Sequence, residues 1–173
     1  MKLDLPMMLF YLLAAAGLQT LLPPVPCEPV ALKVPFLPCV ALYYVLDRPW
    51  PMALTAALWA GIFTDALGGL PCGTTTLPIF LLSVAILAIR RLQPEGSLLP
   101  AVFLGPSMVM LLMLVQAIVV RRTFETPPPF LRSLKTVVVN TAIVAVISPL
   151  FVALARKLDL IAGNVEPRKE IGS

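Results

Sequence analysis

Residues 51–89 read PMALTAALWAGIFTDALGGLPCGTTTLPIFLLSVAILAI, which is two apolar stretches separated by a segment rich in glycine and proline. About 20 apolar residues are needed for a helix to cross the hydrocarbon of a bilayer. Inside hydrocarbon every backbone N–H and C=O must be paired within the protein, so apolar stretches of this length form helices. This part of the sequence therefore predicts two transmembrane helices, 51–69 and 72–89, joined by a tight turn.

The rest of the chain has the same character. Of its 173 residues 59% are hydrophobic and 13% are charged, with a mean hydropathy of +0.94, whereas about a quarter of the residues of a soluble domain are charged. We therefore predict an all-α, polytopic membrane protein with one transmembrane domain, 1–160, and a polar cytoplasmic tail, 161–173. The six expected transmembrane helices are 5–22, 30–46, 51–69, 72–89, 98–120 and 134–155.

The composition argues against catalysis. The chain has no histidine, which excludes histidine bases and histidine-ligated metals. Its three cysteines show no C-x-x-C spacing, and no nucleophile elbow, P-loop or H-E-x-x-H motif is present. We expect no catalytic residue, no metal and no cofactor.

Lysine and arginine indicate the orientation. With six helices and a cytoplasmic N-terminus, eight basic residues lie on the inner side and five on the outer side, which favours two cytoplasmic termini. The inner set is Lys2, Arg48, Arg90, Arg91, Arg156, Lys157, Arg168 and Lys169; the outer set is Lys33, Arg121, Arg122, Arg132 and Lys135.

Asp65 is the most informative polar residue, because an ionisable group within an apolar span costs a few kcal/mol. It is followed by a turn whose glycines and proline permit unusual backbone angles, so we group Asp65, Gly68, Gly69, Pro71 and Gly73 as a structural turn. The carboxylate is expected to accept hydrogen bonds from this turn and from the start of the next helix. A ligand- or proton-binding role is the alternative.

Small residues recur every fourth position in the third expected helix, at Ala53, Ala57 and Gly61. Such a stripe lets two helix backbones approach closely in lipid. It can pack against another helix of this chain or receive the transmembrane helix of a partner, and we take it as the candidate surface for a partner helix.

The remaining polar residues in the apolar stretches are scattered. Gln19 and Asn140 are each expected to be buried and to hydrogen-bond a neighbouring helix. Tyr43, Tyr44 and Trp50 are expected at the membrane–water interface, where amphipathic rings are favoured.

The motif around Asp65 resembles that of the MreD family of bacterial rod-shape proteins: a helix of small residues, an aspartate, a glycine turn and a Pro-x-Gly. Residues 60–73, AGIFTDALGGLPCG, carry the strongest part of this resemblance, which extends over about residues 19–158. Weaker matches are Leu18-Gln19-Thr20-Leu21-Leu22-Pro23, Val139-Asn140-Thr141 and Ser148-Pro149-Leu150. Cys72 at the variable position of the turn and the proline-rich basic segment between the last two helices depart from the family pattern.

The resemblance implies a non-enzymatic scaffold subunit of the cell-elongation machinery in the bacterial cytoplasmic membrane, supporting side-wall peptidoglycan synthesis. Its expected partners are an MreC-like single-pass protein, RodA and a penicillin-binding transpeptidase, with MreB indirectly, membrane lipids and no nucleic acid. The family also resembles the six-helix substrate-binding subunits of energy-coupling-factor vitamin transporters, which supply the expected fold and the alternative function. Their Ala-x-x-x-Ala motif on helix one is absent here, since Leu18, Gln19 and Thr20 follow Ala14, Ala15 and Ala16 at that spacing, and this favours the scaffold.

Overall fold

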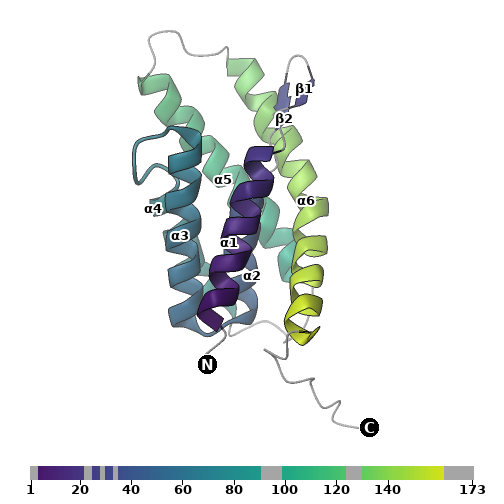
Figure 1. Cartoon of the computed structure of the whole chain (residues 1–173). Helices are drawn as coiled ribbons and strands as arrows, with labels where there is room; N and C mark the ends of the chain where they lie inside the picture. The colour runs from purple at the N-terminus through teal and green to yellow at the C-terminus, as the bar shows by residue number, and fades with distance from the viewer. Residues whose placement is uncertain are drawn as a thin grey trace.

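The computed structural model describes residues 4–21, 25–27, 30–32, 35–90, 99–123 and 130–161, and these residues form six helices and one short β-hairpin (Figure 1). The predicted all-α fold class is confirmed for this part of the sequence, apart from the hairpin, which was not expected. The predicted tail, 161–173, lies outside the described residues apart from Ile161. The elements are α1 (Asp4–Leu21), β1 (Val25–Cys27), β2 (Val30–Leu32), α2 (Phe36–Asp47), α3 (Trp50–Gly68), α4 (Thr76–Arg90), α5 (Leu99–Thr123) and α6 (Phe130–Ile161).

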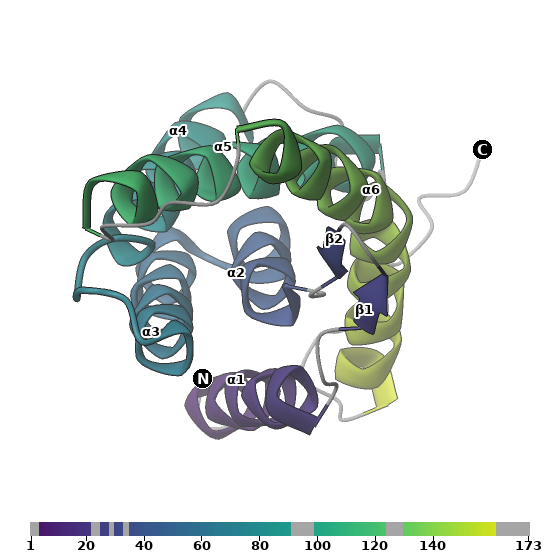
Figure 2. The ribbon, with the colours of Figure 1, turned by 90° about the horizontal axis from the view of Figure 1, so that it is seen from above.

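Helix α2 lies at the centre of the bundle, and the other five helices surround it (Figure 2). It contacts each of them, and they pack against one another in the order α1, α3, α4, α5, α6. The backbones of α6 and α1 do not come into contact within the described residues, so the ring is open between these two helices. The start of α1 and the end of α6 lie at the same end of the bundle (Figure 1).

The sequence of α2 explains its central position. Its residues from Leu37 to Leu46 are all buried, and a helix that is apolar all round is stable only when protein or lipid covers every side. Its 12 residues span about 18 Å at 1.5 Å per residue, which is less than the roughly 30 Å of bilayer hydrocarbon. The five helices around it are all longer, with 15 to 32 residues.

The predicted second helix, 30–46, is wrong at its start. Residues 30–32 form strand β2, which pairs antiparallel with β1 so that Val25 lies opposite Leu32. Helix α2 begins only at Phe36, after Pro35, and Pro38 falls in its first turn. Proline is tolerated there because the first N–H groups of a helix have no partner within it.

The last two helices are longer than expected. Helix α6 begins at Phe130 and continues to Ile161, six residues past the end that hydropathy predicted, and this extension brings Arg156 and Asp159 into the bundle.

Gly105 of α5 faces Ser148 of α6, whose hydroxyl donates to the Ala101 carbonyl at 2.8 Å.

Two helices among the described residues are long and apolar enough to cross a membrane. They are Ala101–Val119, with a mean hydropathy of 2.2, and Ser133–Ile161, with a mean hydropathy of 2.4. Three shorter helices are also apolar: Leu5–Leu21, Phe36–Asp47 and Thr76–Arg90. By this criterion two of the six expected spans are apparent.

The Gly105 contact gives a stability prediction. A Cβ atom at Gly105 would overlap with Ser148 Oγ and lie 2.7 Å from Ser148 Cβ, whereas one at Gly17 meets nothing within 4 Å. Gly105→Ala should therefore destabilise the protein by about 1–3 kcal/mol through overpacking. Gly17→Ala should be neutral or stabilising by up to about 1 kcal/mol, because alanine favours helix. Thermal unfolding in detergent measures both; equal midpoints for the two variants would contradict the α5–α6 packing.

Candidate functional site

The Asp65 side chain joins the end of α3 to the start of α4. Asp65 is fully buried, and its carboxylate accepts the backbone N–H groups of Gly73, Thr75 and Thr76 at 2.9, 2.8 and 3.2 Å. The hydroxyls of Thr75 and Thr76 also donate to it, the latter at 2.8 Å. Five donors thus converge on one carboxylate at the N-terminus of α4, where the helix dipole also favours negative charge.

The local sequence builds this turn. Helix α3 ends because Gly69 takes a left-handed conformation, with φ of 60°. In the turn that follows, Gly73 also has a positive φ, of 99°. Glycine adopts such angles without a steric penalty because it has no Cβ atom. Leu70 N–H donates to the Asp65 carbonyl at 3.1 Å, and the Pro71 carbonyl accepts the Thr74 N–H at 3.1 Å. Gly68 is the last residue of α3 and is exposed. These contacts give the Asp65 carboxylate a structural function.

The small-residue stripe of α3 packs inside the chain. Ala53 and Ala57 have no exposed surface, and Gly61 is buried against Thr76 of α4, whose Cα a Cβ at Gly61 would overlap. The stripe is thus covered by the chain itself, with Gly61 against α4, and is not left open for a partner helix. The intramolecular alternative describes the structure.

The two predicted buried polar residues differ in their contacts. Asn140 is 2% exposed, and its amide nitrogen lies 3.6 Å from the Met113 sulfur, which links α6 to α5. Gln19 is 7% exposed, and its Oε1 meets no donor among the described residues.

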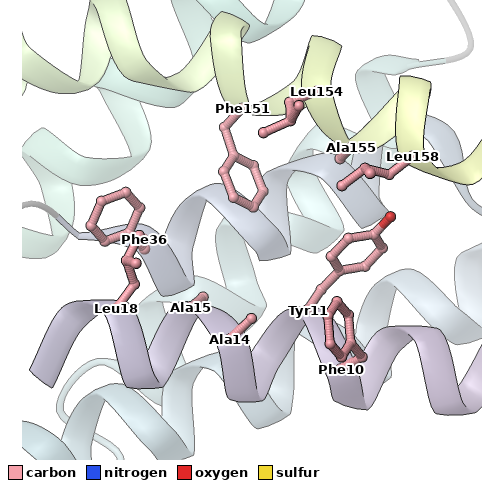
Figure 3. Close-up of a pocket in the computed structure, with 10 residues that line it drawn as sticks. All are labelled: Phe10, Tyr11, Ala14, Ala15, Leu18, Phe36, Phe151, Leu154, Ala155 and Leu158. Atoms are coloured by element: carbon pink, nitrogen blue, oxygen red, sulfur yellow. The ribbon is translucent and has the colours of Figure 1, made fainter. Parts of the chain in front are cut away.

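An apolar groove runs between α1 and α6, where the ring is open (Figure 3). Its volume is about 180 Å³. The Tyr11 hydroxyl points from α1 towards α6 at one end of the groove (Figure 3). The lining residues are Phe10, Tyr11, Ala14, Ala15, Leu18, Phe36, Phe151, Leu154, Ala155 and Leu158.

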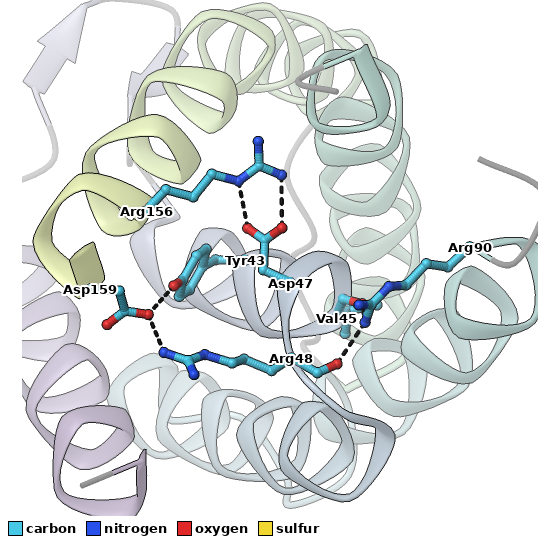
Figure 4. Close-up of polar contacts among 7 residues, drawn as sticks. All are labelled: Tyr43, Val45, Asp47, Arg48, Arg90, Arg156 and Asp159. Carbon is cyan, nitrogen blue, oxygen red and sulfur yellow. Dashed lines mark hydrogen bonds and ion pairs between the residues drawn. The ribbon is translucent and has the colours of Figure 1, made fainter. Parts of the chain in front are cut away.

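Sequence reasoning missed a second buried carboxylate, Asp159 of α6, which has no exposed surface (Figure 4). Arg48, directly after α2, forms an ion pair with it, and the Tyr43 hydroxyl donates to the same carboxylate oxygen. The Tyr11 hydroxyl donates to the other oxygen at 3.2 Å. Tyr43, expected as an interfacial anchor, is instead 1% exposed and binds Asp159.

Two further arginines hold the same end of the bundle (Figure 4). Arg156 donates two hydrogen bonds to Asp47, at 2.7 and 2.8 Å, in a bidentate ion pair. Arg90 of α4 donates to the carbonyls of Val45 and Arg48 at 3.1 and 2.6 Å, and so caps the C-terminus of α2. We call this set the end cluster: Tyr11, Tyr43, Asp47, Arg48, Arg90, Arg156 and Asp159.

A signal for the end cluster was present in the sequence. Asp47 and Arg48 follow one apolar stretch, and Arg156 and Asp159 follow another, with opposite charges available for pairing. Since these residues lie about 110 positions apart, nothing in the local pattern says that the two stretches end side by side. The described residues contain no group of three or more Cys, Asp or Glu side chains placed to hold a metal ion.

No protein-family model, curated protein or solved structure matches the chain significantly.

The Asp65 turn gives a second prediction. Asparagine keeps one acceptor oxygen but presents an NH₂ group to donors, so Asp65→Asn should destabilise the protein by about 1–3 kcal/mol. Asp65→Leu should cost more, because it leaves the N–H groups of Gly73, Thr75 and Thr76 without this acceptor. Hydrogen exchange at Gly73, Thr75 and Thr76 should accelerate in both variants.

Thr74→Ala is the matched control for this turn, since the Thr74 hydroxyl bonds to the Pro71 carbonyl and leaves the carboxylate bonds untouched. Wild-type protection of these amides in Asp65→Leu would show that the carboxylate does not hold the turn.

The end cluster gives a third prediction. Arg48→Met should cost about 3–5 kcal/mol, because it leaves a buried carboxylate without its charge partner. Adding Asp159→Asn removes that charge and keeps an acceptor for the tyrosine hydroxyls, so the double variant should be more stable than Arg48→Met alone. Equilibrium unfolding in mixed micelles measures both. A double variant less stable than the single one would contradict the pairing.

Proposed function

We propose that this chain is a non-enzymatic, six-span subunit of a membrane complex, which binds an MreC-like single-pass protein and supports cell elongation in the bacterial cytoplasmic membrane. The observation that carries the membrane part is the distribution of side chains. Large apolar residues face outward around the ring, including Phe10, Phe103 and Val146, which are 62%, 71% and 71% exposed. A water-soluble monomer rarely exposes apolar surface on this scale.

The interior supports a structural rather than a solute-binding subunit. The hydroxyls of Thr64, Ser83 and Ser148 each donate to a backbone carbonyl of the bundle, at 2.6, 2.7 and 2.8 Å. Asp65 and Asp159 are likewise bound by donors of the same chain. The hydroxyls of Thr64 and Ser83 bond within their own helices, and that of Ser148 links α6 to α5. These polar groups are therefore already engaged by the same chain, which favours the scaffold over the vitamin-transporter alternative.

The geometry accommodates six spans. Helices α1, α3, α5 and α6 have 18 to 32 residues, close to or above the roughly 20 needed to cross. Helix α4 is shorter, with 15 residues. Helix α2 is shorter still but is enclosed by the others, and a short helix with non-helical flanks is tolerated at membrane depth where protein surrounds it.

The charge distribution supports two cytoplasmic termini. The end cluster gathers Arg48, Arg90 and Arg156 at the end of the bundle where α1 begins and α6 finishes. Positive side chains concentrate on the cytoplasmic side of membrane proteins. The Asp65 turn then lies at the outer end.

The identity of the partners rests on the resemblance of residues 60–73 to the MreD motif. In this structure the motif forms the α3–α4 connection that the Asp65 carboxylate organises. The proposed complex includes the MreC-like protein, RodA and a penicillin-binding transpeptidase, with MreB reached through them.

Affinity purification from the organism that encodes the chain tests this function. Purified in mild detergent with a C-terminal tag, the chain should bring down an MreC-like single-pass protein together with RodA or a transpeptidase, identified by mass spectrometry. A six-span membrane protein of unrelated function, tagged and expressed at the same level, is the control for nonspecific recovery. Recovery of a coupling subunit with paired ATPases would overturn the scaffold and establish the transporter alternative.

A further inference from the structure

The ring of helices around α2 has a seam. Helix α1 packs on α2 and α3, and α6 packs on α2 and α5, but α1 and α6 make no backbone contact with each other in the described part of the chain. The apolar groove lies along this seam (Figure 3). Every other pair of neighbouring helices in the ring is in contact, so the seam is the place where the ring can open with the least loss of packing.

A polar contact bridges the seam at the end where α1 begins. The Tyr11 hydroxyl of α1 donates to Asp159 of α6 at 3.2 Å, and both groups are buried. The remaining partners of Asp159, Tyr43 and Arg48, come from α2 and the residue after it. Asp159 is therefore held to α2 independently of α1, and α1 reaches it through the single hydroxyl of Tyr11.

Apart from Gln19 near its C-terminal end, the buried residues of α1 are mainly apolar. Met8, Leu12 and Ala15 are buried in the core cluster shared with α2 and α3. The polar contact to α3, from the Thr55 hydroxyl to the Met8 sulfur, is long at 3.8 Å. In hydrocarbon such apolar packing is not reinforced by the hydrophobic effect, because lipid tails are as apolar as leucine. A hydrogen bond to a charged group therefore contributes a large share of what positions α1 against α6.

We propose that α1 is a lateral gate in the ring and that the Tyr11–Asp159 hydrogen bond is its latch. When the latch is closed, α1 lies against the seam and the groove is narrow. When it is released, the Tyr11 end of α1 moves away from α6, and the buried face of α2 becomes accessible from the membrane. This device does not depend on which partners the chain binds.

Two matched tyrosine variants separate the latch from the rest of the end cluster. Tyr11→Phe removes the hydroxyl that crosses the seam, whereas Tyr43→Phe removes a hydroxyl that reaches the same carboxylate from α2. Both changes keep the aromatic ring and its packing. Only the first should change the separation of α1 and α6.

Pulsed electron paramagnetic resonance in lipid nanodiscs measures this separation. Spin labels are attached to cysteines at Leu5 of α1 and Leu160 of α6, which are 59% and 48% exposed, after Cys27, Cys39 and Cys72 have been replaced. A second pair on α5 and α6, at Phe103 and Leu150, reports whether the fold is retained; these positions are 71% and 70% exposed.

Tyr11→Phe should increase the population at longer Leu5–Leu160 distances by on the order of tenfold, the effect of losing one hydrogen bond to a charged group. Tyr43→Phe should leave this distribution as in the wild type, and the Phe103–Leu150 distances should stay constant in both variants. A Tyr11→Phe distribution that matches the wild type, or equal widening in the two variants, would overturn the latch.

Discussion

The enclosure of α2 is the constraint on which the rest of the structure depends. Residues Leu37 to Leu46 present apolar side chains in every direction and are all buried. A single neighbouring layer cannot cover such a helix, so the other five helices form a ring around it. Close approach of α3 to its neighbours needs small residues, and Ala53, Ala57 and Gly61 provide them, the last against Thr76 of α4. The stripe that looks like a docking surface in the sequence is thus packed inside the chain.

Enclosing α2 also creates a problem at its C-terminal end, where Asp47 and Arg48 follow the last apolar residue. A buried charge without a partner costs several kcal/mol. The extension of α6 supplies Arg156 and Asp159 as partners, and α4 supplies Arg90 for the final carbonyls of α2. Polar bonds therefore tie four helices together at this end: α1, α2, α4 and α6. At the other end of the bundle, Asp65 ties the C-terminus of α3 to the start of α4.

Local features were predictable and distant ones were not. The six helices follow from apolar stretches, and the donors to the Asp65 carboxylate lie 8 to 11 residues away in one glycine-rich turn. The partners of Asp159 lie 111 to 148 residues away, so no local pattern pointed to their pairing. Hydropathy alone ended the last helix at 155, and Asp159 was therefore left outside it. The start of α2 was misplaced because the apolar residues 30–32 fit a strand as well as a helix. They form β2, and α2 begins only after Pro35. The periodicity of the α3 stripe is the same for an internal neighbour and for a partner.

The most direct test of this account is footprinting of the protein in a bilayer with a carbene reagent dissolved in the hydrocarbon. The outward residues of the ring, such as Phe10, Phe103 and Val146, should be labelled strongly because they face the reagent. Residues Val40 to Tyr44 of α2 should remain unlabelled, since all five surrounding helices shield them. Labelling of α2 to the same extent as Phe103 would contradict the enclosure of α2, and absence of labelling throughout would contradict a membrane location.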